Sequence, residues 1–169
     1  MNKLILAICF GLLTSLSFGQ DCKVQFDPFT DSKVVSYEFG KYIIFNLKNN
    51  EVLLRYQLQF DGIMNTEIPE GSVISFRLEN DDIIELLTLE GASPVTISGS
   101  NQSFTSPNVT EYFVNMKLTK KQLKNFAIST MTHVRYPDLK GGFTTSDKSK
   151  RWRRKLKEGA QCIQNNLKK

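Results

Sequence analysis

Apolar and polar residues alternate in short runs along most of this chain, and this alternation limits its fold more than any other feature. In one run, Val52, Leu54, Tyr56, Leu58 and Phe60 alternate with Leu53, Arg55, Gln57 and Gln59. A period of two places every second side chain on one face of an extended strand. Strand-like runs also occur at 34–39, 42–47, 73–78, 83–89, 112–118 and 128–136. The pattern therefore predicts a protein built mainly from half-buried β-strands.

Turn-forming residues separate several of these runs and predict how the strands connect. Gly40-Lys41 and Glu79-Asn80-Asp81-Asp82 each lie between two apolar runs, which is typical of β-hairpins. Residues 27–31 read Asp-Pro-Phe-Thr-Asp and predict a turn. Residues 91–109 are rich in Gly, Ser, Thr, Asn and Pro, so we expect a long loop that carries one edge strand at 95–97.

Two segments have helical patterns instead. Thr119-Lys120-Lys121-Gln122 matches a capping box and predicts a short helix over 120–127. Beyond the loop at Gly141-Gly142, Ser146 or Asp147 is suited to cap a helix over about 147–167. One face of that helix carries Trp152, Leu156, Gly159, Ala160, Ile163 and Leu167. A stripe of this width is expected to pack on a core.

The order of these elements predicts the fold class. We expect an α+β fold, mainly antiparallel β, with one short helix and a long C-terminal helix packed on the sheet. The strands would form a sandwich or a strongly curved sheet. The alternative is a half-barrel that grips the C-terminal helix and leaves an internal cavity.

The N-terminal residues are typical of a secretory signal peptide. Lys3 precedes an apolar stretch from Leu4 to Leu13, and small residues occupy Ser17 and Gly19. We expect cleavage near Gly19-Gln20 and a single exported domain over 20–169, soluble in the periplasm or outside the cell. The alternative is a lipid anchor on Cys22, for which Gly19-Gln20-Asp21 is a poor match.

Two cysteines would remain after cleavage, Cys22 and Cys162, one near each end. Exported proteins meet an oxidising environment in which such a pair usually forms a disulfide. We therefore predict a Cys22–Cys162 bond that closes nearly the whole domain into one loop. The alternative is two unpaired thiols.

Positive charge is concentrated in the last segment. The chain has 22 basic and 17 acidic residues, but residues 147–169 alone hold nine basic and two acidic ones. The candidate contacts for an anionic partner are Lys150, Arg151, Arg153, Arg154 and Lys157. Such a partner would be lipid headgroups, a polysaccharide or an acidic protein. The alternative is a solvated outer helix face, and we expect no nucleic acid because export removes that partner.

No catalytic motif appears in the sequence. His133 is the only histidine, and its strand pattern, with Arg135 on the same side, indicates a solvated face. A hydrolase would need His133 close to a Ser or Asp. One histidine and two paired cysteines cannot form a zinc site, and Glu79, Asp81 and Asp82 are more typical of a hairpin tip than of a calcium loop. We therefore expect neither an enzyme nor a cofactor.

These features together predict an exported, non-enzymatic binding or structural domain. It would contact an anionic envelope component or a protein partner through its basic C-terminal helix. The alternative is a carrier of a small apolar ligand, with its cavity under the curved sheet.

Several short motifs carry a family resemblance. In order, they are Asp27-Pro28-Phe29-Thr30, the hairpin from Gly71 to Ile84, Tyr112 to Leu123, Met131 to Arg135 and the basic terminal helix. The chain resembles small exported, largely uncharacterised β-rich proteins of Bacteroidota-type bacteria, although Asp82 replaces their usual turn glycine. The resemblance implies a β-rich exported domain and no known activity or binding residues.

Overall fold

The computed structural model of the chain describes residues 22–97, 108–138 and 141–167. The predicted signal peptide, and residues 98–107 of the predicted loop, lie outside the described residues. The first elements are β1 (Cys22–Asp27), β2 (Ser32–Phe39), β3 (Ile43–Lys48), β4 (Glu51–Asp61), β5 (Val73–Leu78) and β6 (Ile83–Leu87). The later ones are β7 (Val95–Ile97), β8 (Val109–Leu118), α1 (Lys120–Ile128), β9 (Met131–Pro137), β10 (Phe143–Asp147) and α2 (Lys150–Leu167).

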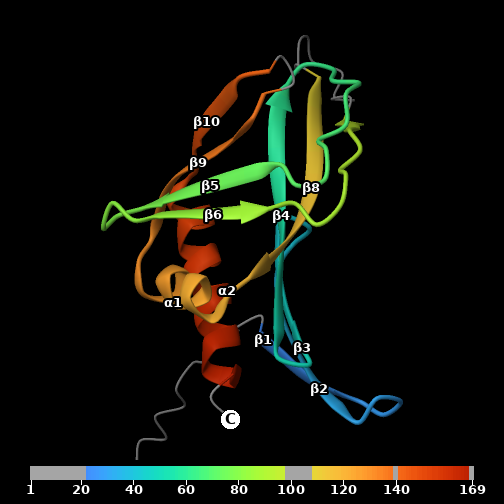
Figure 1. Ribbon diagram of the computed structural model, residues 1–169, viewed down its shortest axis with the longest axis vertical. Helices are drawn as coiled ribbons and strands as arrows, with labels where there is room; N and C mark the ends of the chain where they lie inside the picture. The colour runs from blue at the N-terminus through green and yellow to red at the C-terminus, as the bar shows by residue number, and fades with distance from the viewer. Residues whose placement is uncertain (1–21, 98–107, 139–140, 168–169) are drawn as a thin grey trace, which may run out of the picture.

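The strands form two antiparallel sheets, which confirms the predicted fold class. One sheet has the order β1-β2-β3-β4-β8-β7, and the other has the order β10-β9-β5-β6. Strands β5 and β6 run across the direction of β4 and β8 (Figure 1). The inner faces of both sheets contribute to one buried core, as expected of a sandwich-like arrangement.

The longest strands follow the alternation in the sequence. β4 and β8 pair from Val52 opposite Leu118 to Asp61 opposite Val109. Val52, Leu54, Tyr56, Leu58 and Phe60 are all buried. Because the side-chain period of a strand is two, a register that buries these residues leaves most of their neighbours on the outer face.

The short helix is confirmed, and its capping box is present. The Thr119 hydroxyl accepts the Gln122 backbone N–H at 3.3 Å, and Gln122 Oε1 accepts the Thr119 backbone N–H at 2.9 Å. The helix continues to Ile128, so the strand predicted from residue 128 begins only at Met131. The helix therefore ends one residue beyond the predicted range, and Phe126 and Ala127 are buried in the core.

The start predicted for the long helix is wrong. Ser146 and Asp147 do not cap it, because they belong to strand β10, which pairs with β9. The helix begins at Lys150, where the Ser149 hydroxyl accepts the Trp152 N–H at 3.5 Å and the Ser149 carbonyl accepts the Arg153 N–H at 3.1 Å. A serine therefore caps α2, three residues later than its sequence pattern indicated.

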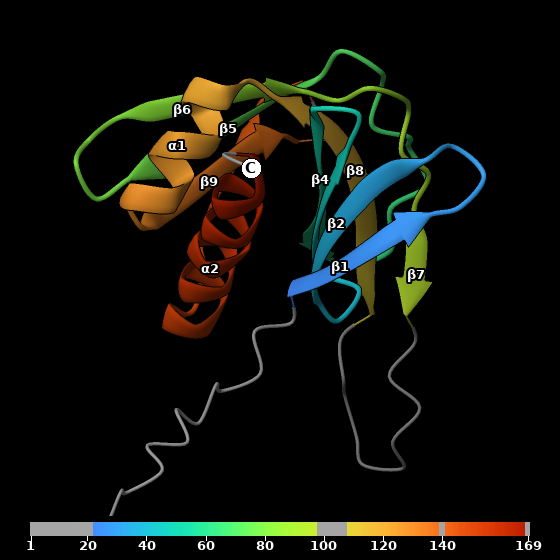
Figure 2. The same ribbon diagram turned by 90° about the horizontal axis from the view of Figure 1, so that it is seen from below.

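α2 packs with the face that the sequence predicts. Leu156, Gly159, Ala160 and Ile163 are buried, while Trp152 and Leu167 are partly buried against the core. Figure 2 shows the helix beside β9 on one side and the six-stranded sheet on the other. An aromatic cluster links these elements, with ring centroids 5.3 Å apart for Tyr56–Phe76 and 5.7 Å apart for Tyr56–Trp152.

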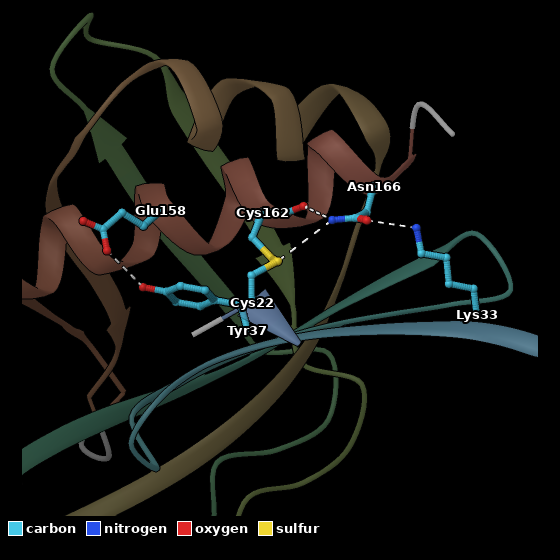
Figure 3. The surroundings of a disulfide bond; sticks show 6 residues. All are labelled: Cys22, Lys33, Tyr37, Glu158, Cys162 and Asn166. Atoms are coloured by element: carbon cyan, nitrogen blue, oxygen red, sulfur yellow. Dashed lines mark hydrogen bonds between the residues drawn. A yellow bond between two sulfur atoms is a disulfide. The ribbon is translucent and has the colours of Figure 1, made fainter. Parts of the chain in front are cut away.

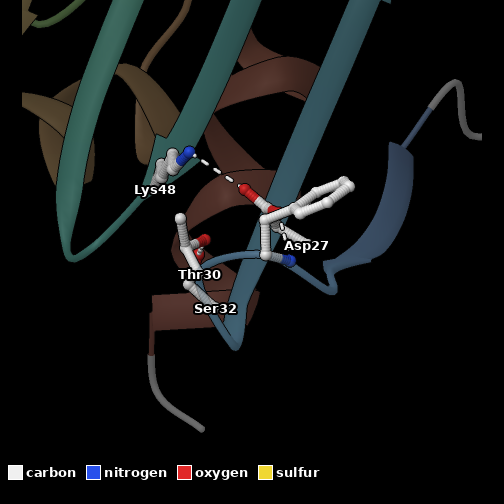
Figure 4. Close-up of polar contacts among 5 residues, drawn as sticks. Asp27, Thr30, Ser32 and Lys48 are labelled. Carbon is white, nitrogen blue, oxygen red and sulfur yellow. Dashed lines mark hydrogen bonds and ion pairs between the residues drawn. The ribbon is translucent and has the colours of Figure 1, made fainter.

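The first strand, β1, has no counterpart among the predicted strands, but the turn after it is confirmed. At its end, Asp27 Oδ1 accepts the Phe29 N–H at 3.0 Å and Asp27 Oδ2 accepts from Lys48 Nζ at 3.1 Å (Figure 4). A hydrogen bond from Thr30, the Phe29 N–H and Lys48 together lower the pKa of Asp27 to about 2. The Asp27 carboxylate is therefore ionised at neutral pH and holds the β1–β2 turn.

Candidate functional site

Four of the five predicted contact residues line one hollow beside α2. Lys150, Arg153, Arg154 and Lys157 form this basic hollow together with Glu79 and Thr130, and its volume is about 400 Å³. Spacings of three and four residues place the four cations on one stripe of the helix. Glu79 comes from the β5–β6 turn and Thr130 from the segment between α1 and β9.

Arg153 is a largely enclosed cation of the basic hollow. Its side chain is 23% exposed, and one guanidinium NH₂ lies 3.9 Å from Asp147 Oδ1. Its Nε is buried and has no hydrogen-bond partner among the described residues. A buried donor without an acceptor costs free energy, so the position of this N–H is unfavourable.

Other cations of the stripe have partners within the protein. Arg154 Nε lies 3.3 Å from Glu158 Oε1, and Lys157 Nζ donates to the Ile128 carbonyl at 3.0 Å. Lys155 Nζ, outside the hollow, lies 2.9 Å from Glu158 Oε2. Because Glu158 is shared, the acidic groups around this stripe compensate only part of its positive charge.

Arg151 does not belong to the hollow. Its guanidinium lies over the Phe39 ring, 5.2 Å from the ring centroid. It therefore faces β2, on another side of the helix from the stripe. The structure thus divides the predicted set of five into a group of four and a separate arginine.

The predicted cysteine pair lies at disulfide distance. The two Sγ atoms are 1.97 Å apart and the Cα atoms 5.9 Å apart, so β1 is joined to α2 (Figure 3). Asn166 lies beside the bond and donates to the Cys162 carbonyl at 2.9 Å, while Lys33 donates to Asn166 Oδ1 at 2.9 Å. Tyr37 donates to Glu158 Oε2 at 3.3 Å on the same side of α2. The bond holds the helix against the edge of the six-stranded sheet.

A larger hollow opens between the two sheets, with a volume of about 790 Å³. Its lining is Gln59, Phe60, Asp61, Met64, Tyr136, Thr144, Thr145, Ser146, Asp147, Lys148, Ser149 and Trp152. Lys148 lies over the Trp152 ring at 5.3 Å, and burial lowers the pKa of its ammonium group. Most of this lining is polar, whereas pockets for apolar ligands are mainly apolar. The hollow therefore lends no support to a carrier of an apolar ligand.

His133 lies exposed on the outer face of β9, as its strand pattern predicts. Its neighbours in register are Arg77 on β5 and Asp147 on β10. The hollow at this face, about 330 Å³, contains Ser75 but also two arginines, Arg77 and Arg135. The Ser75 hydroxyl donates to Glu85 Oε1 at 3.5 Å, so its hydrogen bond goes to a carboxylate and not to His133.

The acidic cluster forms a hairpin tip, as expected. Arg77 lies 2.8 Å from Asp81 Oδ1, and Asn80 donates to Asp82 at 2.8 Å. Within the described ranges, no group of three His, Cys, Asp or Glu side chains is placed to hold a metal ion. No helix in those ranges is both long and apolar enough to cross a membrane.

Comparison with known proteins found no matching family model, curated protein or solved structure.

Proposed function

We propose that this chain is a non-enzymatic exported domain that binds an anionic component of the cell envelope in the basic hollow. The supporting observation is the alignment of Lys150, Arg153, Arg154 and Lys157 on one stripe that lines a concave surface. An anion bound there would interact with all four cations.

The lining favours an ionic ligand over a protein surface. The basic hollow has four cations, one carboxylate and one threonine, and no aromatic or aliphatic residue lines it within the described part of the chain. Protein interfaces usually depend on buried apolar or aromatic anchors. We therefore favour phosphate or carboxylate groups of a lipid or polysaccharide. The cysteine pair fits an oxidising compartment, and export itself stays a prediction.

The test is co-sedimentation with phosphatidylglycerol vesicles at low and high salt, with phosphatidylcholine vesicles for comparison. We expect retention only on the anionic vesicles, and its loss at high salt. The variant Lys150→Gln, Arg153→Gln, Arg154→Gln should lose about 100-fold in affinity, because each cation near an anionic surface contributes about 1 kcal/mol.

A matched control removes the same charge elsewhere. The variant Lys120→Gln, Lys121→Gln, Lys124→Gln changes three exposed cations on α1, outside the basic hollow. It should lose less than about tenfold, since distant exposed charges are screened. Equal losses in the two variants, each with an unchanged circular dichroism spectrum, would show that total charge rather than the hollow determines binding. That result, or no retention of the wild type, would refute the proposal.

A further inference from the structure

The edge strand β1 carries an exposed apolar surface. Val24 is 54% exposed and Phe26 is 64% exposed, and Phe29, in the turn that follows, is 95% exposed. β1 pairs with β2 on one side only and ends the six-stranded sheet. An edge strand of this kind presents unpaired backbone groups that can accept another strand.

The other three edge strands of the described chain are shorter than β1 and so present fewer backbone groups to a partner strand. β7 has three residues, and β6 and β10 have five each, whereas β1 has six. On β6, the Glu85 carbonyl already accepts from Gln122 Nε2 at 3.0 Å. β1 is therefore the longest edge strand in the part of the chain that the structure describes.

We propose that β1 pairs antiparallel with β1 of a second copy of this chain, centred on Gln25. In this register, Lys23 lies opposite the Asp27 of the other copy, and Val24 lies opposite its Phe26. Gln25 lies opposite Gln25. The Lys23–Asp27 and Val24–Phe26 contacts each occur twice because a two-fold axis relates the copies, whereas Gln25 meets the other Gln25 once, on the axis. Opposite charges and an aromatic residue facing a β-branched one are both favourable cross-strand pairs.

The faces of the strand are consistent with this register. Side chains alternate along β1, so Val24 and Phe26 share the face of Cys22, whose sulfur bonds to α2. Lys23, Gln25 and Asp27 share the opposite face, where Asp27 contacts Lys48 and Lys23 lies 3.8 Å from Glu38. A two-fold axis perpendicular to the sheet joins like faces, so two six-stranded sheets would become one continuous sheet. Among the registers that join like faces, only this one places Lys23 opposite Asp27.

The first test measures the monomer–dimer equilibrium of the purified protein by sedimentation equilibrium. We expect a reversible dimer whose dissociation constant rises at least about tenfold in Lys23→Glu, because two attractive pairs become repulsive. Lys121→Glu on α1 is the charge-matched control and should leave the constant within about twofold. A wild type that stays monomeric, or an equal effect of the two variants, would overturn the proposal.

The second test examines the register by cross-linking. Two variants each gain one cysteine, and both keep the Cys22–Cys162 bond. Opposite residues in an antiparallel pair have Cα atoms about 4.5–5.5 Å apart, which is within disulfide range. Gln25→Cys should therefore give a covalent dimer under mild oxidation, identified by mass spectrometry of unreduced peptides. In Lys23→Cys, the two thiols would lie about 13 Å apart along the strands, so no cross-link should form. Cross-linking of Lys23→Cys but not of Gln25→Cys, or of neither variant, would overturn the register.

Discussion

At the scale of single residues, the buried tyrosines differ in how their hydroxyl groups are satisfied. The Tyr136 hydroxyl donates to the Gln59 carbonyl at 3.0 Å, and Tyr112 donates to the Thr66 carbonyl at 2.6 Å. The Tyr56 hydroxyl is fully buried and has no partner among the described residues. Burial, together with the nearby Tyr136, raises the pKa of Tyr56, so its hydroxyl stays protonated at any physiological pH.

This difference predicts opposite effects of two identical substitutions. Tyr56→Phe should raise the free energy of unfolding by about 1 kcal/mol, because it removes an unsatisfied buried group. Tyr136→Phe should lower it by about 1 kcal/mol, because it removes a hydrogen bond. Urea unfolding of both variants measures the effects. Equal destabilisation by the two would show that the Tyr56 hydroxyl has a partner, such as a buried water molecule.

At the scale of elements, one glycine determines how closely α2 approaches the six-stranded sheet. A Cβ atom on Gly159 would lie 2.6 Å from Phe45 Cδ2 and 2.7 Å from Tyr37 Cδ1. Both contacts are shorter than carbon atoms tolerate, and both rings are buried. The helix can therefore rest on these rings only because residue 159 has no side chain.

We expect Gly159→Ala to destabilise the fold despite the higher helix propensity of alanine. Propensity favours alanine by about 1 kcal/mol, whereas overpacking a core costs about 1–3 kcal/mol. The net loss should be about 1–2 kcal/mol in urea unfolding. Asn165→Ala, at an exposed position on the same helix, is the control and should be neutral or slightly stabilising. A more stable Gly159→Ala variant would contradict the close packing.

Some strands can be predicted from their own sequence, and others cannot. In β4, alternate residues are buried, and this burial selects the alternating pattern. β10 exposes most of its side chains, and no apolar alternation marks it. In β1, Cys22, Val24 and Phe26 do alternate with polar residues, but the run has only six residues and Val24 and Phe26 are exposed. The extended conformation of β10 depends on pairing with β9, which local sequence does not encode. For the same reason, the capping pattern at Ser146 and Asp147 indicates a helix start, although both residues belong to β10.

At the scale of the whole molecule, the disulfide closes a loop between cysteines 140 positions apart in sequence. Constraining so long a loop reduces the entropy of the unfolded chain and stabilises the fold by about 4–5 kcal/mol as an upper value. It also joins the edge strand β1 to α2, the element that carries the basic hollow.

We therefore expect Cys22→Ser, Cys162→Ser to lose up to about 4 kcal/mol of unfolding free energy. The loss should be uneven, because β1 and the C-terminal turns of α2 depend on the bond while β4 and β8 pair with each other along their length. In hydrogen exchange, amides of β1 and of the last turns of α2 should lose protection first. Identical unfolding of the reduced and oxidised wild type would contradict this role of the bond.

The basic hollow was predictable only in part. The charge of α2 and its amphipathic spacing are visible in the sequence, and they separate the packing face from the cationic residues. The other walls, Glu79 and Thr130, come from segments far away along the chain. Helix spacing alone does not indicate that Arg151 lies against Phe39. It also does not indicate that Lys150, Arg153, Arg154 and Lys157 line a hollow.

The sequence by itself determined the class of fold, the capped helix α1 and the packing stripe of α2. Each of these depends on a short-range period or on contacts a few residues apart. Only the tertiary structure decided that β10 is a strand, that Tyr56 Oη and Arg153 Nε lie buried without partners among the described residues, and that the basic stripe borders a hollow. These features arise where segments distant in sequence meet. A local sequence pattern does not indicate which distant segment a residue will contact.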